Sequence, residues 1–240
     1  MKNSFFQFKQ FIIHQERSSM KVCTDSCLFG AWIARILEDK QIQPTTILDI
    51  GTGTGLLSLM LSQKTNASID AIEINQLSFE DAKANFAVSP WTSRLQAYLI
   101  DIKDYQPTNQ YDLIITNPPF FEKDLLSSNS EKNIAKHDAG LTLENLLLNV
   151  IRLLKPTGQF AVLLPFNRLK EFISLAEKNE LVLQEKMLAR QTSDHSFFRG
   201  LLLFGKEAKP AVQKEITIKD NDNEYTRDFV RLLGDYYLKL

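Results

Sequence analysis

The feature that most restricts the fold is a glycine-rich loop that directly follows a short apolar run. Residues 47–55 read ILDIGTGTG, and a helical pattern begins near Leu56. Glycine permits positive φ angles and lets a ligand come close to the backbone. A strand that passes through such a loop into a helix is typical of α/β folds that bind a ligand at this turn. We therefore predict a ligand site at residues 49–55.

The rest of the chain alternates apolar runs with amphipathic ones. The expected strands are Ile47–Ile50, Ile69–Ile74, Leu95–Ile100, Leu113–Thr116 and Phe160–Leu164. Continuous apolar strands separated by helices indicate a mostly parallel sheet that is covered on both faces. Two later runs, 181–191 and 198–206, are separated by a polar segment too short for a crossover helix, so we expect an antiparallel hairpin. Residues 226–238 have a final helical pattern. The prediction is an α/β fold with a mostly parallel seven-stranded sheet.

The segment before residue 44 is predicted to form an N-terminal extension. Residues 5–13 loosely alternate aromatic and polar side chains, as in a short strand or hairpin. Thr24 or Asp25 is placed to cap a helix whose apolar residues recur at intervals of three and four as far as Leu37. We expect residues 1–43, as a strand and helix extension, to pack on a main domain of residues 44–240.

Composition excludes several classes of protein. The formal net charge is −1, so any contact with nucleic acid must come from a local basic patch. The two cysteines, Cys23 and Cys27, lack the clusters that structural zinc sites need, and we expect neither a metal site nor a disulfide framework. The chain shows no secretory signal pattern and no run of roughly 18 apolar residues, so we expect a cytoplasmic protein.

Three carboxylates stand where predicted parallel strands end: Asp49, Glu73 and Asp101. A dinucleotide-binding loop would usually have Gly or Ala at the position of Leu56. Asp49 also suits a cationic group better than a pyrophosphate. Glu73 is placed to accept hydrogen bonds from a ribose diol. Each carboxylate alone is equally well explained as a polar strand end, but together with the glycines they predict one crevice.

The acidic residue and the spaced glycines resemble the loop of class I methyltransferases, which have a Rossmann-like fold. In that family the loop lies against the methionine part of S-adenosylmethionine, and the acid after the third strand contacts the adenine amino group. The resemblance implies S-adenosylmethionine as cofactor. The implied binding residues are Asp49, Gly51, Gly53, Gly55, Glu73 and Asp101.

A second motif, NPPF at residues 117–120, follows the apolar run 111–116. Two prolines end the strand and hold the backbone extended and rigid. The side-chain oxygen of Asn117 and the carbonyl of Pro118 could each accept one N–H of an exocyclic amine. Phe120 could stack on the ring that bears this amine, although an ordinary core aromatic is the alternative. Class I amino-methyltransferases carry such a motif after the fourth strand, which implies N-methylation.

The N-terminal sequence also resembles one particular family. MKVCTD at 20–25 and LFGAW at 28–32 resemble the signature of the bacterial tRNA adenine-N6-methyltransferases, with Cys23 where glycine is expected. The likeness includes the glycine loop, NPPF and the C-terminal YYLKL, so it spans nearly the whole chain. Those enzymes modify adenosine 37 of a valine tRNA, which implies a tRNA substrate. The resemblance further implies that Lys21, Thr24 and Asp25 close the cofactor pocket, and that Asn117 borders it.

Other functions remain open at this point. Methylation of a protein glutamine amide needs the same acceptors, but that family carries Tyr in place of Phe120 and a separate N-terminal helical domain. Guanine-N2 methylation of ribosomal RNA and a non-catalytic RNA-binding module are further alternatives. We expect a monomer in which basic residues could surround the pocket mouth, although an ordinary solvated surface charge is the favoured explanation for each. These residues are Lys123, Lys132, Lys136, Arg168, Arg190, Arg199 and Lys206.

Overall fold

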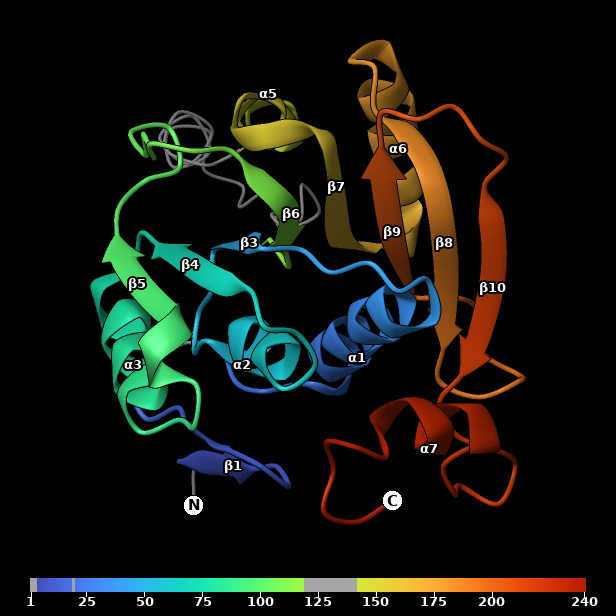
Figure 1. Ribbon diagram of the computed structural model, residues 1–240. Helices are drawn as coiled ribbons and strands as arrows, with labels where there is room; N and C mark the ends of the chain where they lie inside the picture. The colour runs from blue at the N-terminus through green and yellow to red at the C-terminus, as the bar shows by residue number, and fades with distance from the viewer. Residues whose placement is uncertain (1–3, 19, 119–141) are drawn as a thin grey trace, which may run out of the picture.

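The computed structural model describes residues 4–18, 20–118 and 142–240. Its centre is an eight-stranded sheet with the order β10-β8-β9-β7-β6-β3-β4-β5 (Figure 1). The five predicted parallel strands are β3 (Thr46–Ile50), β4 (Ser68–Glu73), β5 (Leu95–Leu99), β6 (Tyr111–Thr116) and β7 (Leu154–Pro165). β9 (Arg199–Gly205) lies antiparallel between β7 and β8 (Val182–Arg190). The predicted α/β fold class and its C-terminal antiparallel hairpin are therefore confirmed.

The sheet has one strand more than the predicted seven. β10 (Val212–Thr217) pairs in parallel with β8 at the edge of the sheet. Of its six residues only Ile216 is buried. An edge strand that contributes a single side chain to the core lacks the apolar run by which the other strands were predicted.

Helices cover both faces of the sheet (Figure 1). On one face, α1 (Thr24–Asp39), α2 (Leu56–Ser62), α3 (Gln76–Ala87) and α7 (Arg227–Leu233) enclose one apolar core. On the other, α5 (Leu143–Leu153) and α6 (Leu169–Lys178) enclose a second. Short 3-10 helices, η1 (Thr92–Arg94) and η3 (Phe166–Arg168), precede β5 and α6. None of the described helices has the length and apolar character needed to span a membrane.

The two ends of the chain meet on the face covered by α1 (Figure 1). β1 (Phe5–Gln7) and β2 (Ile12–His14) form the predicted hairpin. Phe8 forms an isolated bridge with Tyr237, and the N–H of Lys9 donates to the carbonyl of Tyr236 at 2.8 Å. The rings of Phe8 and Tyr237 lie 6.0 Å apart. Aromatic contacts thus fix the N-terminal hairpin to the C-terminal residues.

The start of α1 differs from the prediction. Neither Thr24 nor Asp25 is the N-cap, because α1 begins one residue earlier than expected. Cys23 takes that position without a side-chain hydrogen bond to a backbone N–H of the first turn. Asp25 lies in the first turn instead, where its charge interacts favourably with the helix dipole. Its carboxylate is therefore available to other elements.

Strand order reverses between β3 and β6. The chain builds β4 and β5 on one side of β3 and then crosses to place β6 on the other. Ligands of open α/β sheets bind beyond the carboxyl ends of the strands at such a reversal. Asp49, near the end of β3, and Asn117, directly after β6, stand on either side of it.

Candidate active site

The glycine loop joins the end of β3 to the start of α2. Gly51, Gly53 and Gly55 have φ angles of 68°, 58° and 83°. A Cβ atom added at Gly51 or Gly53 would meet nothing within 4 Å. The N–H groups of Gly51 and Thr52 both donate to the carbonyl of Ile72, which ties the loop to β4. The outer side of this loop is thus open to a ligand.

We expect Gly55→Ala to lower the free energy of unfolding by about 2–4 kcal/mol, because it combines backbone strain with overpacking. A Cβ at this position would lie 2.5 Å from Cε1 of Phe86, under the loop. Gly53→Ala is the matched control, since it has the same sign of φ but open space, and should cost only about 1 kcal/mol. Urea unfolding measures both. Equal losses would contradict the role of the Phe86 contact.

Asp49 lies beneath the loop and is fully buried. Its Oδ2 atom accepts hydrogen bonds from the hydroxyls of Thr52 and Ser58, both at 2.7 Å, and from the N–H of Ser58 at 3.2 Å. Its Oδ1 atom is buried and has no hydrogen-bond partner in the described part of the chain. Burial raises the pKa of Asp49 to about 6, although the bonds from Thr52 and Ser58 oppose this. One carboxylate oxygen therefore stabilises the turn, and the other is left without a partner from the described part of the chain.

Glu73 is the last residue of β4, and Asp101 follows the neighbouring strand β5. Oε2 of Glu73 accepts from the N–H of Gly53, and its Oε1 accepts from the N–H of Asn75, both at 2.9 Å. The backbone N–H of Ile100 donates to the carbonyl of Glu73, which joins the end of β5 to the end of β4. Oδ1 of Asp101 accepts from the N–H of Lys103. Both carboxylates therefore lie at the carboxyl edge of the sheet, with Glu73 in direct contact with the loop.

Asn117 is held by a residue that sequence reasoning missed. Its Nδ2 donates to the hydroxyl of Ser26, on α1, at 2.8 Å. Its Oδ1 is buried and has no partner in the described residues. Thr116, just before it, donates its hydroxyl to the carbonyl of Ile50 and so links β6 to β3. Pro118 is buried, while Phe120 and the segment 122–140, with their predicted roles, lie outside the described residues.

The first turn of α1 joins the Asn117 position to β9. Oδ2 of Asp25 accepts from Nε of Arg199 at 2.8 Å, and its Oδ1 accepts from the N–H of Ser26. Thr24, the first residue of α1, is half-buried. Lys21 instead contacts the preceding segment, where its ammonium group donates to the carbonyl of Gln15. Of the residues predicted to close the pocket, Asp25 is thus the one connected through Ser26 to Asn117.

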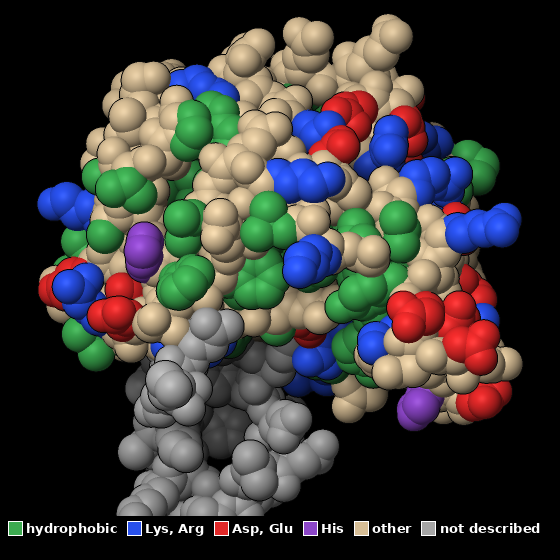
Figure 2. Space-filling model, turned by 90° about the horizontal axis from the view of Figure 1, so that it is seen from below, with side chains coloured by type: hydrophobic (Ala, Val, Ile, Leu, Met, Phe, Trp, Pro, Cys, Tyr) green, Lys and Arg blue, Asp and Glu red, His purple; other side chains and the backbone are tan. Residues whose placement is uncertain are grey.

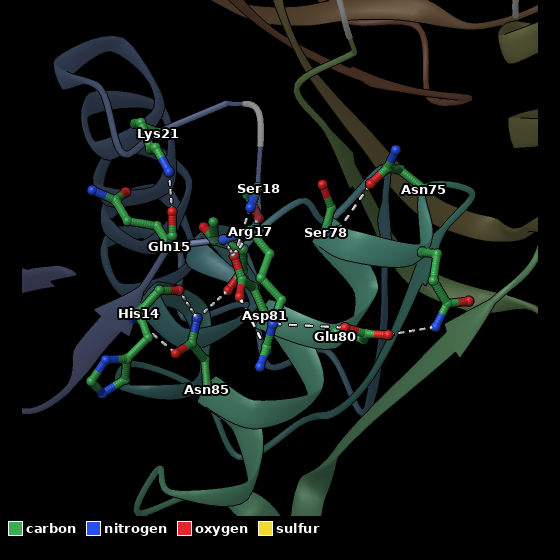
Figure 3. Close-up of polar contacts among 12 residues, drawn as sticks. His14, Gln15, Arg17, Ser18, Lys21, Asn75, Ser78, Glu80, Asp81 and Asn85 are labelled. Carbon is green, nitrogen blue, oxygen red and sulfur yellow. Dashed lines mark hydrogen bonds and ion pairs between the residues drawn. The ribbon is translucent and has the colours of Figure 1, made fainter. Parts of the chain in front are cut away.

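A polar network fixes residues 14–18 against α3 (Figure 3). The buried Asp81 accepts through Oδ2 from the N–H of Ser18 at 2.8 Å, from its hydroxyl at 2.9 Å and from the N–H of Arg17 at 3.1 Å. Asn85 exchanges two hydrogen bonds with the backbone of His14 and donates a third to the carbonyl of Thr54 in the glycine loop. The approach to α1 and the loop are therefore connected. Asp81 and Asn85 stand one helical turn apart, and this spacing could have indicated a shared face.

Comparisons with known proteins show which family the chain resembles. Residues 31–164 match the family model of the methyltransferase small domain. The chain is 39% identical to a tRNA1(Val) (adenine(37)-N6)-methyltransferase of Cytophaga hutchinsonii, with 100% of both chains covered. It is 41% identical to the protein of the same name in Dyadobacter fermentans, with 99% of each chain covered.

Solved structures share the fold. A predicted O-methyltransferase from Agrobacterium tumefaciens superposes with a TM-score of 0.65 at 15% identity, covering 88% of this chain and 96% of that one. The ribosomal protein L11 methylase of Lactobacillus delbrueckii has a TM-score of 0.52 at 19% identity, covering 74% and 78%. At these identities the likeness concerns the fold alone.

Proposed function

The chain belongs to the family of tRNA1(Val) (adenine(37)-N6)-methyltransferases, and we propose that it methylates the exocyclic N6 of adenosine 37 in a valine tRNA. The single observation that supports the chemistry best is the buried Oδ1 of Asn117, which has no hydrogen-bond partner within residues 4–18, 20–118 and 142–240. The amide nitrogen of the same side chain, Nδ2, already donates to the hydroxyl of Ser26. The group that remains for a ligand is therefore the oxygen, which is a hydrogen-bond acceptor. An amino group with two hydrogens is the complementary donor.

The residues at the carboxyl edge fit S-adenosylmethionine. The open side of Gly51 and Gly53 leaves room for a ligand against the backbone. Oδ1 of Asp49, which no described residue pairs with, suits a cationic amino-acid moiety. The carboxylates of Glu73 and Asp101 suit a ribose diol and an adenine amino group. Ile74, whose side chain is 68% exposed beside Glu73, offers apolar surface to a base. When bound, the cofactor supplies an activated methyl group on a positively charged sulfur.

The chain's own contribution is to orient the amine. The lone pair of an adenine N6 is delocalised into the ring, so the nitrogen must become more tetrahedral before it attacks. Oδ1 of Asn117 and the carbonyl of Pro118 each accept one N–H and favour that geometry as positive charge develops. The nitrogen gains the methyl group and then releases one hydrogen to solvent as a proton, because an amide cannot act as a strong base.

Methyl-labelled S-adenosylmethionine tests the proposal. We expect incubation with separate pools of tRNA, ribosomal RNA and protein to label tRNA, and digestion of that RNA to release N6-methyladenosine. A valine tRNA transcript with guanosine at position 37 is the control and should stay unlabelled. Labelled N2-methylguanosine or N5-methylglutamine would instead support the rival activities. The absence of any label, together with weak cofactor binding, would indicate a non-catalytic module.

A further inference from the structure

Two aromatic rings lie beside the candidate active site without a role in it. Phe166 begins η3, directly after β7, and its side chain is 43% exposed. Its ring centroid is 5.7 Å from that of Phe197, and the two planes are tilted by 39°. The guanidinium group of Arg190 lies 5.3 Å from the Phe197 ring centroid, and its Nε donates to the hydroxyl of Thr217 at 2.9 Å. We call Phe166, Phe197 and Arg190 the aromatic shelf.

The shelf stands at the same edge of the sheet as Asn117. β6 and β7 are parallel neighbours with Thr116 opposite Val162, so both chains emerge in the same direction. Strand spacing and the rise per residue place the Cα atoms of Asn117 and Phe166 on the order of 10 Å apart. The N–H of Phe166 also donates to the carbonyl of Phe198, one residue before Arg199. The first turn of α1 binds both Arg199 and Asn117, and so connects the shelf with the acceptor.

Charge on this surface favours stacking over phosphate binding. Arg168 pairs with Glu171 at 2.8 Å, Arg199 pairs with Asp25 at 2.8 Å, and Arg190 lies 3.9 Å from Glu215. These carboxylates offset the charge of arginines that the sequence suggested as phosphate contacts. On the face of the molecule that Figure 2 shows, seen from below in Figure 1, basic side chains are interspersed with acidic and hydrophobic ones. The exposed ring of Phe166, beside the half-buried Phe197 and the arginine that contacts Phe197, remains as the candidate recognition element.

We propose that the aromatic shelf stacks an unpaired nucleobase that flanks the target adenosine in the RNA. The inference rests on the proposed function, because an adenine that enters the site must leave its own stack and deprive its neighbour of a stacking partner. Phe166 presents an aromatic face to the neighbouring base. The ring of Phe197, which itself contacts the guanidinium group of Arg190, packs beside the Phe166 ring. Stacking of this kind contributes about 1–3 kcal/mol per base and tolerates any base.

Phe166→Ala tests the shelf with an anticodon stem-loop of the valine tRNA as probe. We expect its Kd, measured by fluorescence anisotropy, and its KM to rise about tenfold, the lower part of the range for one stacked base. The kcat at saturating RNA and the affinity for S-adenosylmethionine should stay within about twofold of wild type, because no acceptor is removed. Phe166→Trp should retain binding, whereas Phe166→Leu, which is apolar but has no π face, should lose it.

The exposed Phe5, on β1, provides the matched control, and Phe5→Ala should leave RNA binding unchanged. Wild-type RNA affinity in Phe166→Ala, or in Phe166→Leu, would overturn the shelf while normal N6-methyladenosine formation by the wild type still supported the proposed function. A wild-type protein that forms no N6-methyladenosine in this RNA would overturn the function and the shelf together.

Discussion

Replacing Asn117 by alanine should lower kcat by at least about a hundredfold, the scale observed when one fixed catalytic hydrogen bond is lost. The amide oxygen has no partner in the described residues and is held in place because its nitrogen is bound to Ser26. Without it, one N–H of the substrate amine loses its acceptor, and the nitrogen is no longer oriented. The Kd for S-adenosylmethionine should change little, since the carboxylates and the glycine loop stay intact. Single-turnover kinetics and calorimetry measure the two quantities separately.

Two further variants test whether the loss of kcat comes from the amide oxygen of Asn117. Ser26→Ala removes the support of the amide but keeps its oxygen, so we expect an intermediate loss of about tenfold in kcat. Asn149, a half-buried residue on α5 whose amide bonds to its own helix and to Arg152, is the matched control, and Asn149→Ala should leave kcat unchanged. Normal turnover in Asn117→Ala would contradict the role of the amide oxygen. A large rise in the cofactor Kd with unchanged kcat would assign the residue to cofactor binding alone.

Apolar runs were sufficient to predict the central strands, because parallel strands are buried on both faces. Leu113–Thr116, for example, was expected, and the structure extends this strand back only to Tyr111. The periodicity carried no comparable signal for β10, which faces solvent over most of its length. The N-cap of α1 was misplaced because Thr24 and Asp25 both have side chains suited to capping, whereas the helix begins after Cys23.

Positions at strand ends were also predictable, since the carboxyl ends of parallel strands meet at one edge. This topology alone was enough to predict that Asp49, Glu73 and Asn117 lie at the same edge of the sheet. Ser26 was not recognisable as part of the site, and Arg199 was expected only as a basic residue at the pocket mouth and not as the partner of Asp25. Their partners are 91 and 174 residues away in the chain. Such contacts depend on how α1 packs against the sheet. Nothing in the local sequence distinguishes Ser26 from an ordinary polar residue on a helix.

Glu73→Ala should raise the Kd for S-adenosylmethionine about a hundredfold, because hydrogen bonds to a charged group contribute about 1.5–3 kcal/mol each. Each carboxylate oxygen already accepts one backbone N–H, from Gly53 or from Asn75, and each retains a lone pair for a ribose hydroxyl. The substitution would remove both acceptors and also the brace that orients the loop. Calorimetric titration of the cofactor measures the loss.

Even a conservative substitution of Glu73 should weaken the binding of S-adenosylmethionine. In Glu73→Gln one oxygen becomes an amide nitrogen that faces a backbone N–H, so a donor meets a donor, and we expect the Kd to rise more than about tenfold. Asp70, on the same strand, is the matched control, because its carboxylate accepts from the hydroxyl of Tyr111 at 2.6 Å, within the sheet. Asp70→Asn should leave the cofactor Kd unchanged. A Glu73→Gln protein with wild-type affinity would mean that the carboxylate bonds to Gly53 and Asn75 do not shape the pocket.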